Sequence, residues 1–265
     1  MKKETDLAIR MKSYEERQDF KLLTKMPVVV RIDGRAFHTF TKGMVRPFDD
    51  DVLLEAMRRT ALYLCKNISG CVFGYTQSDE ITLVLTDYEN YNSQPWFDYR
   101  IQKICSITAS MATKEFNTSF RELVNKKYEK ISSEEATLYR NSIDKAMFDS
   151  RAYNMPIDDV PNVLYWRQLD ASKNSVSQVA QSMFSNKELH GKNQADRIDM
   201  LFEKGLNWYD MPIYLKRGTC VVQIINDKKE KEWIVDKNAP IFKNDWNYIT
   251  DRIKFEDDFK ESVNM

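Results

Sequence analysis

Apolar and polar residues alternate along parts of this chain in the pattern of β-strands. Residues 28–33 are mostly apolar β-formers and end in Asp33, which is typical of a buried strand that delivers a carboxylate to its end. Residues 71–86 read as two strands joined by a tight turn at Ser78 and Asp79. We therefore expect three central strands whose ends meet at one edge of a sheet.

Helical spacing of apolar residues predicts the elements around these strands. The predicted helices cover residues 4–24, about 49–64, about 96–120, about 158–184 and 193–204. Asp49 or Asp50 is expected to cap the second of them. A further strand is expected at 146–153 and a hairpin at 218–235, whereas 122–145 is charged and aperiodic and is interpreted as a surface connection. The pattern predicts an α+β fold, with an antiparallel-rich sheet covered on one face by two long helices.

Composition changes this picture mainly by exclusion. The 40 Lys and Arg residues balance 40 Asp and Glu, so any nucleic-acid site must be a local patch. The four cysteines form no CxxC pair, which favours reduced thiols and a cytoplasmic location. No stretch approaches the roughly 18 apolar residues of a membrane span, and the N-terminus lacks the apolar core of a signal peptide, so we expect a soluble protein without a membrane partner.

Metal and phosphate chemistry is restricted in the same way. Only two histidines are present, and neither has a cysteine or second histidine at metal-ligand spacing, which argues against zinc. The seven glycines form neither a P-loop nor a dinucleotide-binding motif. A protein of this kind that handles phosphate therefore needs carboxylate-bound metals and basic side chains.

The carboxylates at the predicted strand ends are the candidate for such a site. If the three strands pair, Asp33 meets Asp79 and Glu80 at one end of the sheet, with the Gly34 carbonyl beside them. Such an oxygen-rich site suits Mg²⁺ and can hold two ions, as nucleotidyl transfer requires. Acidic residues in turns also form Asx-turns and caps, so a purely structural role for Asp79 and Glu80 stays open on the pattern alone.

Several blocks, taken together and in order, resemble the tRNA(His) guanylyltransferase family. The resemblance covers nearly the whole chain. The blocks are residues 28–38 (VVVRIDGRAFH), 46–49 (RPFD), 74–80 (GYTQSDE), 166–170 (WRQLD), 189–197 (LHGKNQADR) and 211–219 (MPIYLKRGT).

The resemblance implies a palm-like catalytic domain over residues 1–155, completed into one globular unit by a helical and hairpin extension over 156–265. It implies addition of nucleotides to the 5′ end of tRNA in the 3′-to-5′ direction, with ATP and GTP or other nucleoside triphosphates as substrates. Two Mg²⁺ ions would be held by Asp33, the Gly34 carbonyl and Asp79, with Glu80 as a further catalytic carboxylate. The family also implies a homotetramer.

The same resemblance implies a set of nucleotide contacts. Arg46, Arg100 and Lys103 are candidates for the triphosphate, although clustered cations on a helix are also found simply facing solvent. The full set of predicted nucleotide-binding residues is Asp33, Gly34, Arg35, Ala36, Phe37, His38, Arg46, Ser78, Asp79, Arg100 and Lys103.

One departure from the family affects the expected substrate. Members that guanylylate histidine tRNA typically carry His-Ile-Asn-Asn shortly after the Trp-Arg-Gln block, and here the matching stretch is residues 172–175 (SKNS). This divergence resembles the guanylyltransferase-like branch, which repairs truncated tRNA 5′ ends by templated addition. Three alternatives stay open: guanylylation of histidine tRNA itself, a palm-type nucleotidyl cyclase or signalling-nucleotide synthase, and a tRNA-binding protein without catalysis. Basic runs at 126–130 and 228–231 are candidate RNA contacts, but neither is decisive.

Overall fold

The protein is built on one antiparallel sheet of six strands, in the order β4-β1-β3-β2-β5-β6. The computed structural model describes residues 5–89 and 92–254. The strands are β1 (Val28–Gly34), β2 (Cys71–Gln77), β3 (Glu80–Leu85), β4 (Phe148–Asn154), β5 (Thr219–Ile225) and β6 (Lys231–Asp236). All of these strands were expected from the sequence. The C-terminal hairpin is part of the central sheet, because β5 pairs with β2.

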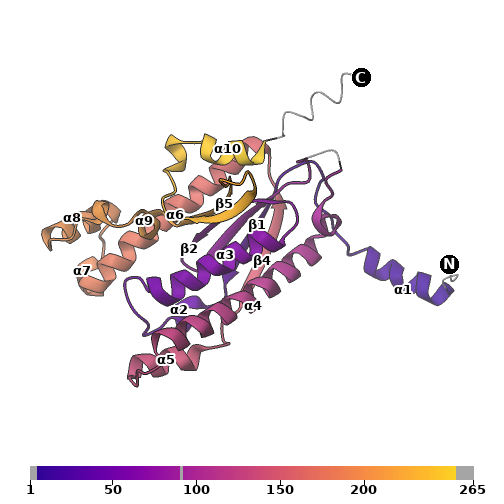
Figure 1. Ribbon diagram of the computed structural model, residues 1–265. Coiled ribbons are helices and arrows are strands. Elements are labelled where there is room, and N and C mark those ends of the chain that lie inside the picture. Colours follow the sequence, from indigo (N-terminus) through magenta and orange to yellow (C-terminus); the bar gives the residue numbers. More distant parts are fainter. Residues whose placement is uncertain (1–4, 90–91, 255–265) are drawn as a thin grey trace.

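The two faces of the sheet pack against different helices, as the alternation of side chains along a strand requires. Val28, Val30 and Ile32 of β1 face α3 (Glu55–Asn67) and α4 (Ile101–Lys127). Val29 belongs to the core on the opposite face, which is covered by α6 (Val160–Met183) and α10 (Asn247–Ile253). Figure 1 shows α3 and α4 lying side by side across the sheet. The expected pair of long helices on one face is confirmed, and α6 and α10 add a helical layer on the other.

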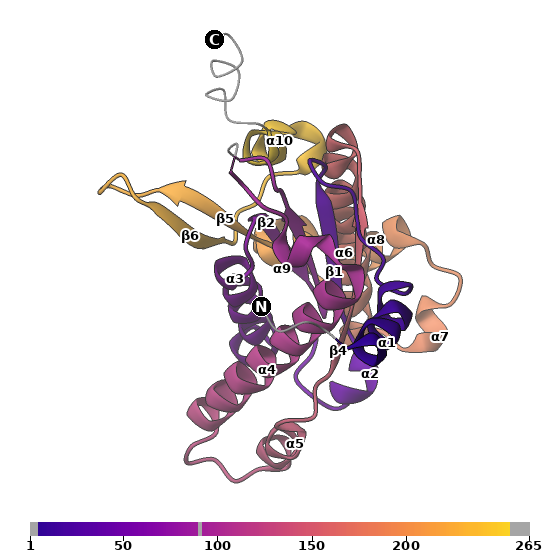
Figure 2. The ribbon, with the colours of Figure 1, turned by 90° about the vertical axis from the view of Figure 1, so that its right-hand side faces the viewer.

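Short helices complete the chain, and β5 and β6 extend as a hairpin beyond the body of the molecule (Figure 2). These helices are α1 (Asp6–Glu16), α2 (Phe37–Phe40), α5 (Glu134–Ser142), α7 (Asn186–Leu189), α8 (Gln194–Glu203) and α9 (Ile213–Arg217). No helix in the described part of the chain is long and apolar enough to cross a membrane. The four cysteines are free, and three of them are buried.

Two expectations about the helices were wrong. The predicted helix over 4–24 is only α1, and its apolar stripe faces solvent: Leu7 is 67% exposed and α1 has no buried residue. Figure 1 shows α1 standing apart from the sheet. Residues 122–145 are largely helical, because α4 continues to Lys127 and α5 follows. Ser133 caps α5, and Ala136 and Tyr139 are buried. These few buried side chains hold the helix in place, but they are too few among charged residues to give a helical pattern in the sequence.

Gly74 on β2 lies directly beneath Cys65 of α3. A Cβ atom at this position would overlap the Cys65 sulfur and lie 3.3 Å from the Cβ of Val221. We expect Gly74→Ala to lower the free energy of unfolding by about 1–3 kcal/mol, because overpacking forces neighbouring atoms apart. Urea denaturation measures the change. The double variant Cys65→Ala/Gly74→Ala should lose less than the sum of the two single losses, and simple additivity would show that this close approach is not the cause.

Candidate functional site

The strand register brings three carboxylates to one end and one face of the sheet. Asp33 on β1 lies directly opposite Glu80 on β3 and also opposite Asp149 on β4. Residues directly opposite each other in antiparallel strands point to the same side. The backbone N–H of Gly34 donates to the Asp79 carbonyl at 3.0 Å, which ties the end of β1 to the β2–β3 turn. The predicted meeting of the Asp33 strand end with the acidic turn is therefore confirmed.

Among the described residues, few groups stabilise the negative charge of the Asp79 carboxylate. Ser78 occupies the left-handed region in the turn, with φ of 51°, and its hydroxyl donates to Asp79 Oδ1 at 3.0 Å. Burial raises the pKa of Asp79, the Ser78 hydrogen bond opposes this, and the charge of Asp33 raises it further. Burial also raises the pKa of Asp33, followed by the charge of Asp149, while arginines oppose the shift. Negative charge is thus concentrated at this end of the sheet beyond what its hydrogen bonds neutralise.

Glu80 differs from the two aspartates because it has a dedicated cation. Arg167 on α6 donates from Nη1 to Glu80 Oε2 at 2.8 Å, and both side chains are 8% exposed. The Arg31 Nε lies 3.9 Å from the same carboxylate oxygen. Burial raises the pKa of Glu80 and Arg167 opposes it. This carboxylate is therefore held in place by α6, on the same face as Asp33.

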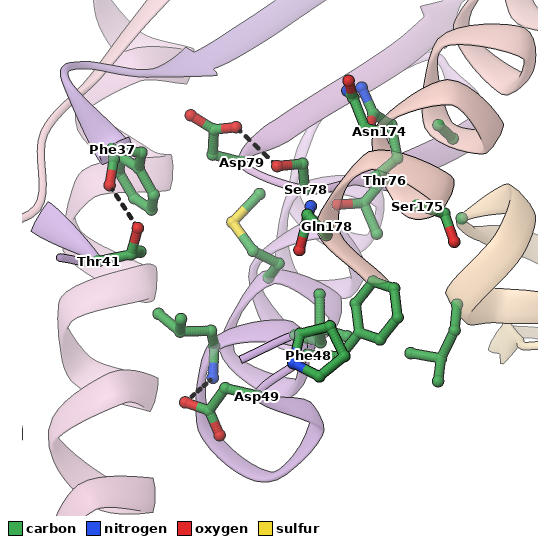
Figure 3. Close-up of a pocket in the computed structure, with 18 of the residues that line it drawn as sticks. Phe37, Thr41, Phe48, Asp49, Thr76, Ser78, Asp79, Asn174, Ser175 and Gln178 are labelled. Carbon is green, nitrogen blue, oxygen red and sulfur yellow. Dashed lines mark hydrogen bonds between the residues drawn. The ribbon is translucent and has the colours of Figure 1, made fainter. Parts of the chain in front are cut away.

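A cleft of about 460 Å³ opens beside the Asp79 turn, within the usual size range of a small-molecule site (Figure 3). Its walls come from the β1–α2 segment, the start of α3, the β2–β3 turn, α6, and the α9–β5 connection. Gly34 ends β1 shortly before α2, where a Cβ would overlap the Phe37 ring. Of the residues predicted to contact the nucleotide, those that line the cleft are Gly34, Ala36, Phe37, His38, Arg46, Ser78 and Asp79.

The remaining predicted nucleotide contacts lie outside this cleft. Asp33 points to the α6 face beside it, and Arg35 extends toward Met147. Arg100 forms an ion pair with Asp19 at 3.0 Å, and the Lys103 ammonium lies over the Phe97 ring.

Arg100 and Lys103 therefore do not line this cleft, and their assignment as triphosphate contacts stays a prediction. Arg100 immediately precedes α4 and lies next to the segment that leads into β1, whereas the cleft lies at the far end of β1. The seven residues of β1 span roughly 20 Å at about 3.3 Å per residue. Spacing along a helix predicted that the two cations share a face, but it carried no information about which end of the sheet they reach.

Other residues of the cleft were not predicted as site residues. Asn174 and Gln178 come from α6, Tyr214 from α9, and Asp49 from the loop before α3. Asp49 does cap the following helix, as expected, by accepting from the backbone N–H groups of Val52 and Leu53. Tyr214 falls in the family block 211–219 and Asn174 in the divergent stretch 172–175, but neither stretch gives a direction for its side chains, and the sequence carried no signal for Gln178.

The carboxylate end fits Mg²⁺ by the chemistry of its donors. In the described residues no three His, Cys, Asp or Glu side chains cluster as a complete metal cage. Mg²⁺ is usually held by one or two carboxylates plus water and substrate phosphates, so a full cage is not required. Asp33 and Asp79, with raised pKa values caused first by burial, and the adjacent Gly34 carbonyl form such an incomplete, oxygen-only set.

Neutralising Asp79 is expected to stabilise the metal-free protein at neutral pH. Because the pKa of Asp79 is raised in the folded state, its contribution to stability is complete below the ordinary value of 3.8 and is lost as pH rises through the raised value. In the presence of a chelator, Asp79→Asn should therefore gain stability over wild type as the pH is raised from about 4 to about 7. Urea unfolding at each pH measures this gain.

The matched control is Asp199→Asn on α8, an exposed carboxylate away from the cleft, which should show no such gain. Mg²⁺ should stabilise wild type at neutral pH and have a smaller effect on Asp79→Asn. A gain for Asp79→Asn that is independent of pH would contradict the charge argument.

Comparison with known proteins adds to this geometry. A family model described as tRNAHis guanylyltransferase matches residues 8–156. A bacterial tRNA(His) guanylyltransferase (Thg1)-like protein, solved in complex with ATP, is 42% identical with a TM-score of 0.81, over 95% of this chain and 100% of that one. A structure of such a bacterial protein in complex with GTP has 39% identity and a TM-score of 0.74, with the same coverage. The probable tRNA(His) guanylyltransferase of Dictyostelium discoideum is 29% identical over 236 residues, covering 84% of each chain.

Proposed function

The chain belongs to the tRNA(His) guanylyltransferase family of nucleotidyltransferases, and on that premise we propose that it repairs truncated tRNA 5′ ends by templated 3′-to-5′ addition. ATP adenylylates the 5′-monophosphate of the tRNA and releases pyrophosphate. The 3′-hydroxyl of an incoming nucleoside triphosphate then attacks the activated 5′-phosphate and displaces AMP, and water afterwards removes pyrophosphate from the 5′-triphosphate of the added nucleotide. The observation that carries the proposal is the register that sets Asp33 beside the Asp79 turn at the mouth of a nucleotide-sized cleft.

The metal belongs to this proposal. Asp33, the Gly34 carbonyl and Asp79 would hold two Mg²⁺ ions, and Glu80, held by Arg167, completes the acidic face. When bound, Mg²⁺ neutralises triphosphate charge and lowers the pKa of the attacking hydroxyl. The excess negative charge at the two aspartates supports this assignment.

The nucleotide is assigned to the cleft beside Asp79. The segment from Gly34 to His38 forms one wall, and Ser78 lies at the turn. Arg46 adds a cation whose guanidinium is 3.4 Å from the Thr41 hydroxyl, so it can contact phosphate oxygens without leaving a buried partner unpaired. The bacterial relatives solved with ATP and with GTP support both purine nucleotides as substrates.

Repair, rather than guanylylation of histidine tRNA alone, is proposed from residues 172–175. Where typical histidine-specific members have His-Ile-Asn-Asn, Ser172 donates to the Lys216 carbonyl at 3.0 Å, and Ser175 accepts from the Trp208 indole at 3.0 Å. Both serines serve packing between α6 and the α8–β5 region. No imidazole is present in this stretch to contact a substrate.

The test compares 5′ extension of a truncated tRNA, an intact histidine tRNA lacking its extra guanosine, and an intact non-histidine tRNA, with Mg²⁺, ATP and each labelled nucleoside triphosphate. We expect extension of the truncated tRNA with the nucleotide complementary to the template. Addition of guanosine to histidine tRNA alone would favour strict guanylylation instead. Cyclic or dinucleotide products without RNA would favour a cyclase, and no product at all would overturn the proposal.

A cytoplasmic homotetramer is part of the same proposal. Free cysteines support a reducing compartment, and the solvent-facing apolar residues Leu7, Met11 and Tyr14 of α1 support contact with another copy. Light scattering on the full chain and on Leu7→Ser/Met11→Ser measures the mass. A monomeric full chain would remove this part of the proposal.

A further inference from the structure

The polar residues of α6 between positions 172 and 178 include two groups that differ in their hydrogen bonding. Ser172, Ser175 and Ser177 each have a protein partner, namely the Lys216 carbonyl, the Trp208 indole and Arg197. In contrast, the side-chain amides of Asn174 and Gln178 have no hydrogen-bond partner among the described residues, although both line the cleft. Figure 3 shows them on the α6 side, close to Thr76 and Ser78. Two unpaired amides in a formed cleft are free to bind a ligand.

The spacing of these amides suits a flat polar edge. Asn174 and Gln178 are four residues apart on α6, so their Cβ atoms lie about 5–6 Å apart on the same helix face. Apolar side chains, including Phe48, Leu53 and Met57, line other parts of the cleft. An apolar wall with a few convergent polar groups is typical of a site for a planar heterocycle, whose faces pack while its edge forms hydrogen bonds.

The buried carboxylate of the cleft is already occupied by protein donors. Asp49 Oδ1 accepts from the Val52 N–H at 3.3 Å and from the Lys127 ammonium at 3.4 Å. Asp49 Oδ2 accepts from the Leu53 N–H at 3.3 Å and from the Tyr139 hydroxyl at 2.7 Å. An ionised carboxylate offers about four lone-pair sites, so four donors saturate it. A base edge therefore finds no free acceptor at Asp49.

We propose that Asn174 and Gln178 contact the nucleobase of the bound nucleoside triphosphate and make the cleft tolerant of more than one base. The inference rests on the proposed function, which places a nucleotide in this cleft. Each amide carries a donor and an acceptor and can present either by rotating, whereas a carboxylate only accepts. A cleft that reads the base through two amides does not impose one donor and acceptor pattern, and base choice is then left to a template.

The experiment measures binding of GTP, ATP, CTP and UTP, each with Mg²⁺, by calorimetry in the absence of RNA. Wild type should bind all four within about tenfold of one another. In Asn174→Ala/Gln178→Ala the affinity for each should fall about tenfold, as expected for the loss of base hydrogen bonds. Inorganic tripolyphosphate is the probe for the phosphate part of the site, and its affinity should be unchanged. A parallel loss of tripolyphosphate affinity, or unchanged nucleotide affinity, would overturn the inference.

A second variant tests the amide chemistry directly. Asn174→Asp/Gln178→Glu keeps the shape but removes the donors, so it should shift the preference toward GTP over UTP by about tenfold, because guanine presents more donors on its edge. All four ligands carry the same triphosphate, so their ratio is insensitive to the added charge. The control is Lys173→Ala, because Lys173 is an exposed neighbour on α6 outside the cleft. It should leave the ratio of GTP to UTP affinity unchanged. A variant that acts only on folding should also leave this ratio unchanged. An unaltered ratio in the acidic double variant contradicts the inference.

Binding without RNA also separates this inference from the proposed function. If the amide variants change nucleotide binding as described but wild type extends no RNA, the proposed reaction fails and the base contact stands. If wild type extends truncated tRNA but the variants bind all four nucleotides unchanged, the base contact fails and the reaction stands.

Discussion

Asp79→Ala is expected to reduce 5′ extension of a truncated tRNA by at least about a thousandfold. Removing this carboxylate takes away one of the two side chains proposed to hold Mg²⁺, and metal stabilisation of transition-state charge is worth several kcal/mol. The fold should survive, because among the described residues the only side-chain partner of Asp79 is the Ser78 hydroxyl in an exposed turn. Single-turnover extension, with circular dichroism to check the fold, measures the effect.

Asp199→Ala is the control for this prediction, since Asp199 is an exposed carboxylate on α8 away from the cleft. Its extension rate should stay within twofold of wild type, on the order of the small effects usual for surface substitutions. If Asp79→Ala extends tRNA at a rate within tenfold of wild type, Asp79 is not a metal ligand and the proposed site is wrong.

Arg167→Met is expected to lower the free energy of unfolding by about 3–5 kcal/mol, because it leaves the Glu80 carboxylate buried without its cation. The side chains of Arg167 and Glu80 are both 8% exposed. The other nearby cation is Arg31, whose Nε lies 3.9 Å from Glu80 Oε2, too far for a hydrogen bond. For a chain of this size the loss corresponds to a fall in melting temperature of roughly 10 °C. Urea denaturation and calorimetry at neutral pH measure it.

The rescue of this loss identifies its cause. In Arg167→Met/Glu80→Gln no buried charge is left unpaired, so we expect a large part of the stability to return. Arg151→Met is the matched control: Arg151 pairs with Asp149 in an exposed position, and its loss should cost at most about 1 kcal/mol. A double variant no more stable than Arg167→Met would show that lost packing, rather than the unpaired carboxylate, is responsible.

The central strands and the acidic turn were predictable from the sequence because their signals are local. The apolar run of β1 ends at Asp33, and the β2–β3 hairpin is so short that its turn could only fall at Ser78 and Asp79. A tight turn makes β2 and β3 antiparallel. The pairing of β1 with β3, which brings Asp33 opposite Glu80, was expected only if the three strands pair. The family resemblance pointed to the same residues.

Residues whose roles depend on distant contacts were not predictable in this way. Arg167 lies in a family motif that predicts no role for it, yet it neutralises Glu80, which is 87 positions away in the sequence. α5 was missed because its buried side chains are few, and the spacing that predicted a helix over 4–24 did not show that the apolar stripe of α1 is exposed. Periodicity shows that a helix has an apolar side, but it does not show whether another element covers that side.

The sequence by itself determined the antiparallel hairpin, the carboxylates at its turn and the family of the chain, since short-range patterns and ordered motifs carry this information. Only the tertiary structure decided which side chains share the cleft. It set Asn174 and Gln178 facing the Asp79 turn, saturated Asp49 with four donors, and left Arg100 at the other end of the sheet. The physical reason is that contact between segments depends on strand order and helix direction, which local spacing does not encode.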